Sequence, residues 1–201
     1  MNKEFPLTKK QIALFASALA LNLMVFYGAR LINGDMEHHD LSIALDHQVP
    51  LMPWTVFIYL GAFLFWIINY CICIKYDKYN GRSFIIAHYI GEAVCFICFL
   101  VLPTALTRPE ITGHTFADFA MRVTYMCDQP NNLFPSIHCM VSWFCWIGVR
   151  GNEHVPKWYQ YFSLIFAIAI CISTVTVKQH VIVDTFSGVL LAEVSYLISR
   201  Q

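Results

Sequence analysis

The stretch WTVFIYLGAFLFWIINYCICI, Trp54–Ile74, decides the fold, because it contains no charged residue over its whole length. A helix needs about 20 predominantly apolar residues to cross the hydrocarbon core of a bilayer. This stretch therefore predicts a membrane-spanning helix. The whole chain has the same character, since 58% of its residues are hydrophobic and 13% are charged, about half the charged share of a typical soluble domain.

Other apolar stretches of comparable length follow the same pattern. They are Gln11–Ile32, Phe84–Leu102, Ser136–Val149, Trp158–Val177 and Val181–Ser199. The stretch 136–149 is short, so we expect it to use its flanks or to start inside a re-entrant loop. No small-residue cleavage site follows 11–32, so we expect a retained helix there and not a signal peptide. The sequence predicts an all-α polytopic membrane protein, a bundle of six transmembrane helices in one domain, 1–201.

The distribution of cations predicts the orientation of this bundle, because Lys and Arg concentrate in cytoplasmic loops. If the helices alternate in direction, nine of the thirteen cations lie on one side: Lys3, Lys9, Lys10, Lys75, Lys78, Arg82, Arg150, Lys157 and Arg200. The other side holds Arg30, Arg108, Arg122 and Lys178, together with most of the acids. We therefore expect both termini in the cytoplasm. The zero net charge gives no indication of nucleic-acid binding.

A polar island separates the last two apolar stretches, and it faces the extracytoplasmic side in this orientation. It reads STVTVKQHVIVD, residues 173–184. His180 and Asp184 are four residues apart, so on a helix they share a face. A carboxylate that holds one imidazole nitrogen leaves the lone pair of the other nitrogen free. This arrangement favours a histidine nucleophile.

Two more polar clusters lie on the same side, TRPE at 107–110 and NNLFPSIHC at 131–139. Ser136 lies at a predicted helix start, which favours an anion, and His138 can protonate a leaving oxygen. Arg108 and Lys178 offer positive charge suited to phosphate. Each feature alone is usually structural. Their joint appearance on one membrane face favours a site, since ionisable residues at membrane depth are usually functional.

The three clusters together resemble the signature motifs of the type 2 phosphatidic acid phosphatase (PAP2) superfamily of membrane lipid phosphatases. Its first motif, Lys-x6-Arg-Pro, is represented by Arg108-Pro109, with Val101 in the lysine position. Its second, Pro-Ser-Gly-His, reads PSIH at 135–138. Its third, Ser-Arg-x5-His-x3-Asp, is found at 173–184 with Thr174 in place of arginine. The form of these motifs also resembles the branch containing inositol-phosphorylceramide synthases.

This resemblance implies roles for the matching residues. His180 would form a phosphohistidine, Asp184 would orient it, and His138 would be the general acid that later activates water. The residues implied to hold phosphate are Arg108, Ser136 and Ser173, with Lys178 as a candidate substitute for a missing family cation. No metal or other cofactor is implied.

The sequence therefore predicts a metal-independent lipid phosphate phosphatase with its active site on the extracytoplasmic face of the plasma membrane. Phosphatidic acid, phosphatidylglycerol phosphate and a polyprenyl pyrophosphate such as undecaprenyl pyrophosphate all fit as substrates. One alternative is a head-group phosphotransferase, like the synthases of inositol-phosphorylceramide or sphingomyelin, which uses the same His/His/Asp site. An alternative from another class is a non-enzymatic transporter or scaffold.

Several residues are left without an assigned role. Glu37, His38, His39 and Asp40 leave a metal site open, although we favour a short interfacial helix around 41–45 in a loop, 35–48, that covers the lipid entrance. Glu92 and Glu193 are expected to lie at similar depth and to be able to meet, with His88 as the simplest partner of Glu92. Cys127 can pair with Cys139, which the sequence does not decide. Asp118, Arg122 and Asp128 are expected to be solvated loop residues.

Overall fold

The computed structural model describes residues 7–77 and 81–200, and most of these are helical. The helices are α1 (Lys9–Asn33), α2 (Val56–Tyr76) with the short 3-10 turn η1 (Pro53–Thr55) before it, α3 (Arg82–Val101), α4 (Phe116–Cys127), α5 (Ile137–Val149), α6 (Lys157–Thr176) and α7 (Ile182–Ser199). No strand occurs within the described ranges. Lys3 and Lys78, two of the cations used to predict the orientation, lie outside them.

Among the residues that the structure describes, five helices are long and apolar enough to cross a membrane: α1, α2 with η1, α3, α6 and α7. The sixth predicted span, α5, is a shorter apolar helix. The all-helical membrane class predicted from the sequence is confirmed, and the helix bounds differ from the predicted ones by a few residues at most. The count of six spans and the orientation in the membrane remain predictions.

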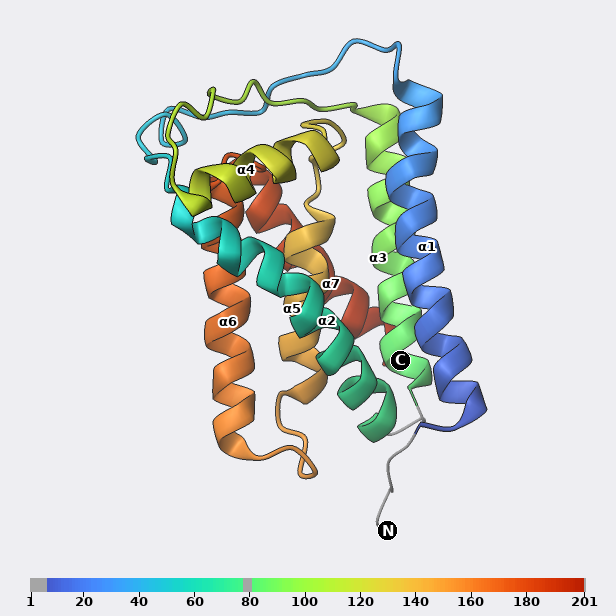
Figure 1. Ribbon diagram of the computed structural model, residues 1–201. Coiled ribbons are helices and arrows are strands. Elements are labelled where there is room, and N and C mark those ends of the chain that lie inside the picture. The colour runs from blue at the N-terminus through green and yellow to red at the C-terminus, as the bar shows by residue number, and fades with distance from the viewer. Residues whose placement is uncertain (1–6, 78–80, 201) are drawn as a thin grey trace.

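The helices form two groups that meet along the bundle (Figure 1). α1 and α3 lie side by side, while α5 packs against α2, α6 and α7. The described ends of the chain lie at one end of the bundle, and the long connections 34–52 and 102–115 lie with α4 at the opposite end, which we call the loop end. The turn between α6 and α7 also reaches the loop end, so the three predicted motif segments are gathered there.

An additional helix, α4, crosses the loop end in a region that the sequence analysis treated as solvated loop (Figure 1). Its start is capped reciprocally, since the Thr115 hydroxyl accepts from the Asp118 N–H at 3.2 Å and the Asp118 carboxylate accepts from the Thr115 N–H at 2.8 Å. Arg122 donates to the carbonyls of Ile111 and Gly113. The expectation of solvated side chains was therefore wrong, because these polar groups satisfy the backbone of the connection.

The connection 34–52 also differs from its prediction. No helix forms around 41–45, where the chain makes a turn. Asp46 accounts for this, since its carboxylate accepts from the backbone N–H groups of Ile43 and Ile182, both within 2.9 Å. The connection is thereby tied to the first turn of α7. His38 and Asp40 bind neighbouring groups of their own chain segment, Met36 and Ser42, instead of sharing a metal site.

The buried acids in the helices have separate partners. Glu92 in α3 accepts from Asn22 of α1 at 2.8 Å and lies 3.7 Å from His88, the predicted partner. Glu193 in α7 instead accepts from Trp143 at 2.9 Å and from Arg150. The expected meeting of Glu92 and Glu193 is therefore not seen, because each carboxylate is bonded within its own helix pair.

The cysteine pairing left open by the sequence is absent. Cys127 is exposed at the end of α4, whereas Cys139 is buried in α5, and both are free thiols. Cys139 instead packs with its sulfur 3.5 Å from the Thr174 hydroxyl of α6. It therefore serves helix contact in this fold, as small buried thiols commonly do.

Candidate active site

The turn between α6 and α7 positions His180 and Asp184. α6 ends at Thr176, and the Thr174 carbonyl then accepts from the N–H groups of both Gln179 and His180, at 2.9 and 3.1 Å. Lys178 takes the left-handed conformation with φ of 56°, which reverses the chain. This tight turn places His180 just before the first residue of α7, on the side of its helical neighbour Asp184.

The carboxylate of Asp184 lies against one nitrogen of the His180 ring. His180 Nδ1 is 3.4 Å from Asp184 Oδ2, and the two side chains are 10% and 1% exposed. The same carboxylate oxygen accepts from the Val181 N–H at 3.1 Å, which fixes its position at the start of α7. Burial lowers the pKa of His180, but the adjacent Asp184 carboxylate outweighs burial and raises that pKa above its usual 6.5. Contact through Nδ1 leaves Nε2 as the nitrogen available for attack.

The start of α5 docks directly onto the start of α7. Ser136 caps α5, since its hydroxyl accepts from the Cys139 N–H at 3.2 Å, and its own N–H donates to the Asp184 carbonyl at 3.1 Å. Gly188 permits this approach, because a Cβ at that position would lie 2.4 Å from the Ser136 carbonyl oxygen. Because of this contact, His138 in the first turn of α5 lies near the turn that contains His180.

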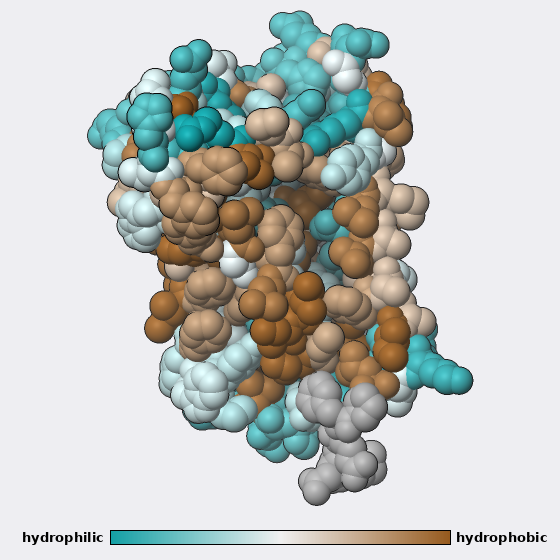
Figure 2. Space-filling model, in the orientation of Figure 1, coloured by the Kyte–Doolittle hydropathy of each residue, from teal (hydrophilic) through white to brown (hydrophobic). Residues whose placement is uncertain are grey.

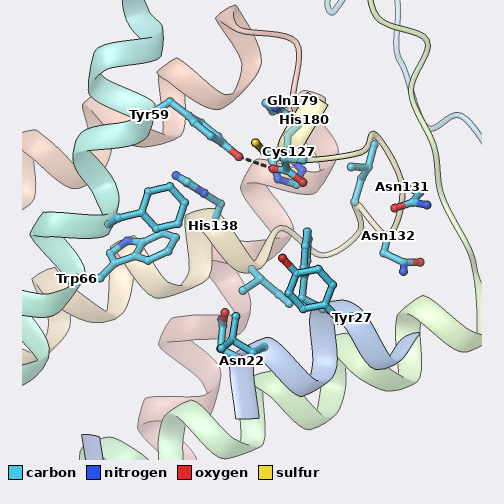
Figure 3. Close-up of a pocket in the computed structure, with 16 residues that line it drawn as sticks. Asn22, Tyr27, Tyr59, Trp66, Cys127, Asn131, Asn132, His138, Gln179 and His180 are labelled. Atoms are coloured by element: carbon cyan, nitrogen blue, oxygen red, sulfur yellow. Dashed lines mark hydrogen bonds between the residues drawn. The ribbon is translucent and has the colours of Figure 1, made fainter. Parts of the chain in front are cut away.

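Three aromatic side chains of α2 surround the ring of His138 (Figure 3). Tyr59 stacks on it with 4.1 Å between ring centroids and 9° between planes. The rings of Trp66 and Phe63 approach it edge-on, with centroid distances of 4.7 and 5.9 Å. The Tyr59 hydroxyl donates to Asp128 Oδ2 at 2.8 Å. Aromatic packing of this kind holds the imidazole in one plane.

Both histidines line one cavity of about 270 Å³ near the loop end. Tyr59, Asp128 and Gln179 also line it, with residues of α1 on the opposite wall. His138 Nε2 and Gln179 Nε2 are buried and have no hydrogen-bond partner among the residues that the structure describes. The side-chain nitrogen of Asn132, another lining residue, is also unpaired there. Buried polar atoms are normally paired, so a bound ligand could satisfy these nitrogens.

Two arginines meet at residue 128 beside this cavity. Arg30 donates to the Asp128 carboxylate at 3.3 Å and to the Gln129 carbonyl at 2.8 Å. Arg108 donates to the Asp128 carbonyl at 2.6 Å and to the side-chain oxygen of Gln179, and it lies over the Tyr125 ring. Burial lowers the pKa of Arg108 from its usual 12.5, and Asp128 opposes that shift. An arginine side chain stays protonated in proteins, so a positive charge lies behind Gln179, next to the cavity but outside its lining.

The other predicted phosphate ligands bind backbone groups. The Ser173 hydroxyl donates to the Ile170 carbonyl at 2.7 Å, within α6. The Lys178 ammonium donates to the carbonyls of Asp46 and Val49, at 3.2 and 2.6 Å. Ser136 is fully buried as a helix cap. The structure thus brings His138, His180, Asp184 and Arg108 together, whereas phosphate binding by Ser136, Ser173 and Lys178 stays a prediction.

Four residues of this region had no predicted role in the site: Arg30, Tyr59, Asp128 and Gln179. Arg30 carried a weak signal, since it is one of the few cations on the side that is poor in them. Asp128 is an acid of the same side. Tyr59 is one aromatic residue in an apolar span, and Gln179 is one amide beside the predicted nucleophile, so nothing in the local pattern distinguished them.

Metal ligands do not gather in this region. Over residues 7–77 and 81–200, no three side chains of His, Cys, Asp or Glu form a group suited to a metal ion. The cavity presents the unpaired side-chain nitrogens of His138, Gln179 and Asn132, and the charge of Arg108 lies behind Gln179. These fit an oxyanion.

Comparison with known proteins agrees with the motifs. The model of the PAP2 superfamily matches residues 104–201, the segment that contains Arg108, His138, His180 and Asp184. Tyr59 and Arg30 lie outside the matched segment. Searches of curated proteins and of solved structures gave no match.

Proposed function

We propose, from the premise that the chain belongs to the PAP2 superfamily through residues 104–201, that it hydrolyses a lipid phosphate by way of a phosphohistidine. Membership in this superfamily supports phosphatase or phosphotransferase chemistry on lipid phosphates. The observation that carries the proposal is the shared cavity: His138 and His180 line it together, and Asp184 contacts the far nitrogen of His180.

The first step would be attack of His180 Nε2 on phosphorus. The bond from phosphorus to the lipid oxygen breaks, and His138 Nε2 gives its proton to that oxygen. Positive charge that develops on the His180 ring is stabilised by the Asp184 carboxylate at Nδ1. Negative charge on the phosphoryl oxygens is stabilised by the positive charge of Arg108, which lies behind Gln179.

The second step would return the enzyme to its starting state. His138, now neutral, takes a proton from water, and the oxygen attacks the phosphohistidine as the bond from phosphorus to nitrogen breaks. The stack with Tyr59 keeps the His138 ring in place between the two steps. Inorganic phosphate leaves, and each histidine regains its initial protonation.

A lipid substrate is supported by an apolar groove that continues from the cavity. A neighbouring hollow of about 240 Å³ lies between α1 and α2, and it shares Asn22, Leu23, Phe63 and Trp66 with the cavity. Figure 2 shows a hollow in this face of the molecule, bordered mostly by apolar residues. We infer that the hydrocarbon chain lies in the groove while the phosphate reaches the histidines.

The substrate and location follow from these features as parts of the same proposal. Phosphatidic acid, phosphatidylglycerol phosphate and a polyprenyl pyrophosphate each combine a phosphate monoester or anhydride with long chains. Five long apolar helices and the PAP2 family fit an integral membrane protein. The excess of Lys and Arg on one side supports an extracytoplasmic site in the plasma membrane.

The test is phosphate release from a panel of lipid phosphates by the purified protein in EDTA. We expect release by the wild type and loss of about 10³-fold or more in His180→Ala, as for other nucleophiles. His154→Ala is the matched control, since His154 is exposed and belongs to the α5–α6 connection. Radiolabelled substrate should leave acid-labile label on the wild type. Normal release by His180→Ala would refute the enzyme and favour a transporter or scaffold.

A second candidate, head-group phosphotransfer, is favoured by the charge of the cavity. Val101, in the position of the family lysine, is 78% exposed, and the Thr174 hydroxyl donates to the Cys171 carbonyl. Arg30 is already paired with the Asp128 carboxylate. Few cations therefore remain for phosphate, which suits a singly charged phosphodiester better than a doubly charged monoester. Incubation with a lipid phosphodiester and an alcohol would yield a new phosphodiester in this case, instead of free phosphate.

A further inference from the structure

We propose that Gln179 binds the substrate phosphate directly and that Arg108 acts on the phosphate through it. This inference rests on the proposed function and identifies a contact within the same site. Gln179 precedes the proposed nucleophile in the chain and lines the cavity beside it (Figure 3). Arg108 lies behind Gln179 and is absent from the lining of the cavity.

The bond to Arg108 determines which end of the Gln179 amide faces the cavity. A guanidinium has five N–H donors and no acceptor. The atom of Gln179 that contacts Arg108 must therefore be the carbonyl oxygen, as the structure has it. The –NH2 group then points away from Arg108, and the assignment does not depend on a choice between equivalent amide flips.

The free –NH2 group is an unsatisfied donor inside the protein. Gln179 is 1% exposed, and its Nε2 has no hydrogen-bond partner within the described part of the chain. An unpaired buried donor is destabilising, so a ligand oxygen at this position would recover a favourable bond. The neighbouring orphan donor, His138 Nε2, lines the same cavity. A phosphoryl group placed at His180 would offer oxygens to both.

The surrounding contacts hold this donor in place. The Gln179 N–H donates to the Thr174 carbonyl at 2.9 Å, so its backbone is fixed in the tight turn. Arg108 is in turn fixed by the Asp128 carbonyl and by the ring of Tyr125. Because hydrogen bonds in a chain polarise one another, the charge of Arg108 strengthens the Gln179 donor. A neutral amide backed by a cation thus takes the place of a cation in direct contact.

The experiment measures binding of orthovanadate, a phosphate mimic, and turnover of lipid phosphate by the purified full-length chain. We expect Gln179→Ala to weaken vanadate binding and lower kcat/KM by about 10- to 100-fold, the range for a hydrogen bond to a charged group. Gln179→Glu retains an acceptor for Arg108 but turns a carboxylate oxygen to the phosphate, so its loss should be larger. If the alanine variant does not fold, vanadate binding by the near-isosteric Gln179→Glu variant tests the inference instead.

Gln160→Ala is the matched control, because Gln160 is also a buried amide but bonds Gly151, Asn152 and Val155 at the other end of α6. It should lower the unfolding temperature and leave vanadate affinity unchanged. Unchanged vanadate affinity in a folded Gln179→Ala protein overturns the inference, as does a wild type that binds no vanadate. Gln179-dependent vanadate binding without turnover would support the contact and refute the proposed function.

A double-mutant cycle tests the part played by Arg108. If Arg108 acts through Gln179, Arg108→Ala should add little to the loss of vanadate affinity already caused by Gln179→Ala. If the losses of vanadate affinity in the two single variants add up in the double variant, Arg108 reaches the phosphate independently of Gln179. That result would overturn the proposed action of Arg108 through Gln179.

Discussion

A single carboxylate sets the protonation of the proposed nucleophile. His180 is nearly enclosed, and burial by itself favours the neutral ring. Asp184, at 3.4 Å from Nδ1, favours the protonated ring more strongly, so the pKa of His180 is raised. Attack requires a neutral Nε2, and the proportion of neutral His180 therefore falls as the pH drops through this raised pKa.

This balance predicts the acid limb of the pH profile. In the wild type, kcat/KM should fall with decreasing pH at an apparent pKa above 6.5. In Asp184→Asn the opposing charge is lost while burial remains, so the limb should move to lower pH. The maximal rate should also fall by about 100-fold or more, because the imidazolium is no longer stabilised. A profile of kcat/KM from pH 5 to 9 checks this, and an unshifted limb would show that His180 is not the titrating group.

At the scale of elements, the site depends on one close helix crossing. α5 and α7 meet where Gly188 faces the Ser136 carbonyl, and the Ser136 N–H bonds the Asp184 carbonyl. This crossing sets the distance between α5, which carries His138, and the start of α7, which follows His180. Local helix propensity does not explain a glycine here, since glycine is unfavourable inside a helix by about 1 kcal/mol.

Enlarging Gly188 should therefore damage both stability and activity. Even a Cβ would lie 2.4 Å from the Ser136 carbonyl oxygen, so Gly188→Val must separate the two helices, at a cost of about 1 to 3 kcal/mol. Thermal unfolding in detergent and phosphate release measure the two effects. Gly28→Ala is the control, because nothing lies within 4 Å of a Cβ there, and it should be neutral or stabilising. A Gly188→Val protein as stable and active as the wild type would contradict the proposed importance of the crossing.

At the scale of the whole molecule, the segment matched to the family contains the proposed reacting groups, and the preceding helices complete the cavity. α2 provides the aromatic wall around His138, and α1 provides the opposite wall and Arg30. The groove between α1 and α2 then runs on from the cavity as a path for a hydrocarbon chain. The proposed path for the hydrocarbon chain is therefore lined mostly by residues outside 104–201.

Filling this groove should discriminate between substrates by chain length. Leu23 lines both the cavity and the groove and is 47% exposed. We expect Leu23→Trp to lower kcat/KM for a long-chain lipid phosphate by about tenfold or more, while a short-chain soluble analogue is hydrolysed nearly as before, because the loss of one buried chain segment costs about 1 to 3 kcal/mol. Leu190→Trp, on α7 at 54% exposure, is the control. Equal losses on both substrates would place the hydrocarbon chain elsewhere.

The sequence by itself determined the helices and was enough to propose the reacting residues. Long apolar runs have few alternatives to a helix in a bilayer, since every backbone group must be bonded within the segment. The predicted stretch 54–74 therefore lies close to α2 with η1. The spacing of His180 and Asp184 likewise depends on about one turn of local geometry. It brings the two side chains together, although His180 precedes the first turn of α7.

Only the tertiary structure decided what surrounds these residues. Tyr59 stacks on His138, and Arg30 pairs with Asp128, across long separations in the chain. The tertiary structure also directs Lys178 toward the connection 34–52 and leaves the –NH2 group of Gln179 without a partner beside the cavity. Such contacts depend on how whole helices cross, and a side chain in an apolar run carries no local mark of the partner that packing will bring to it.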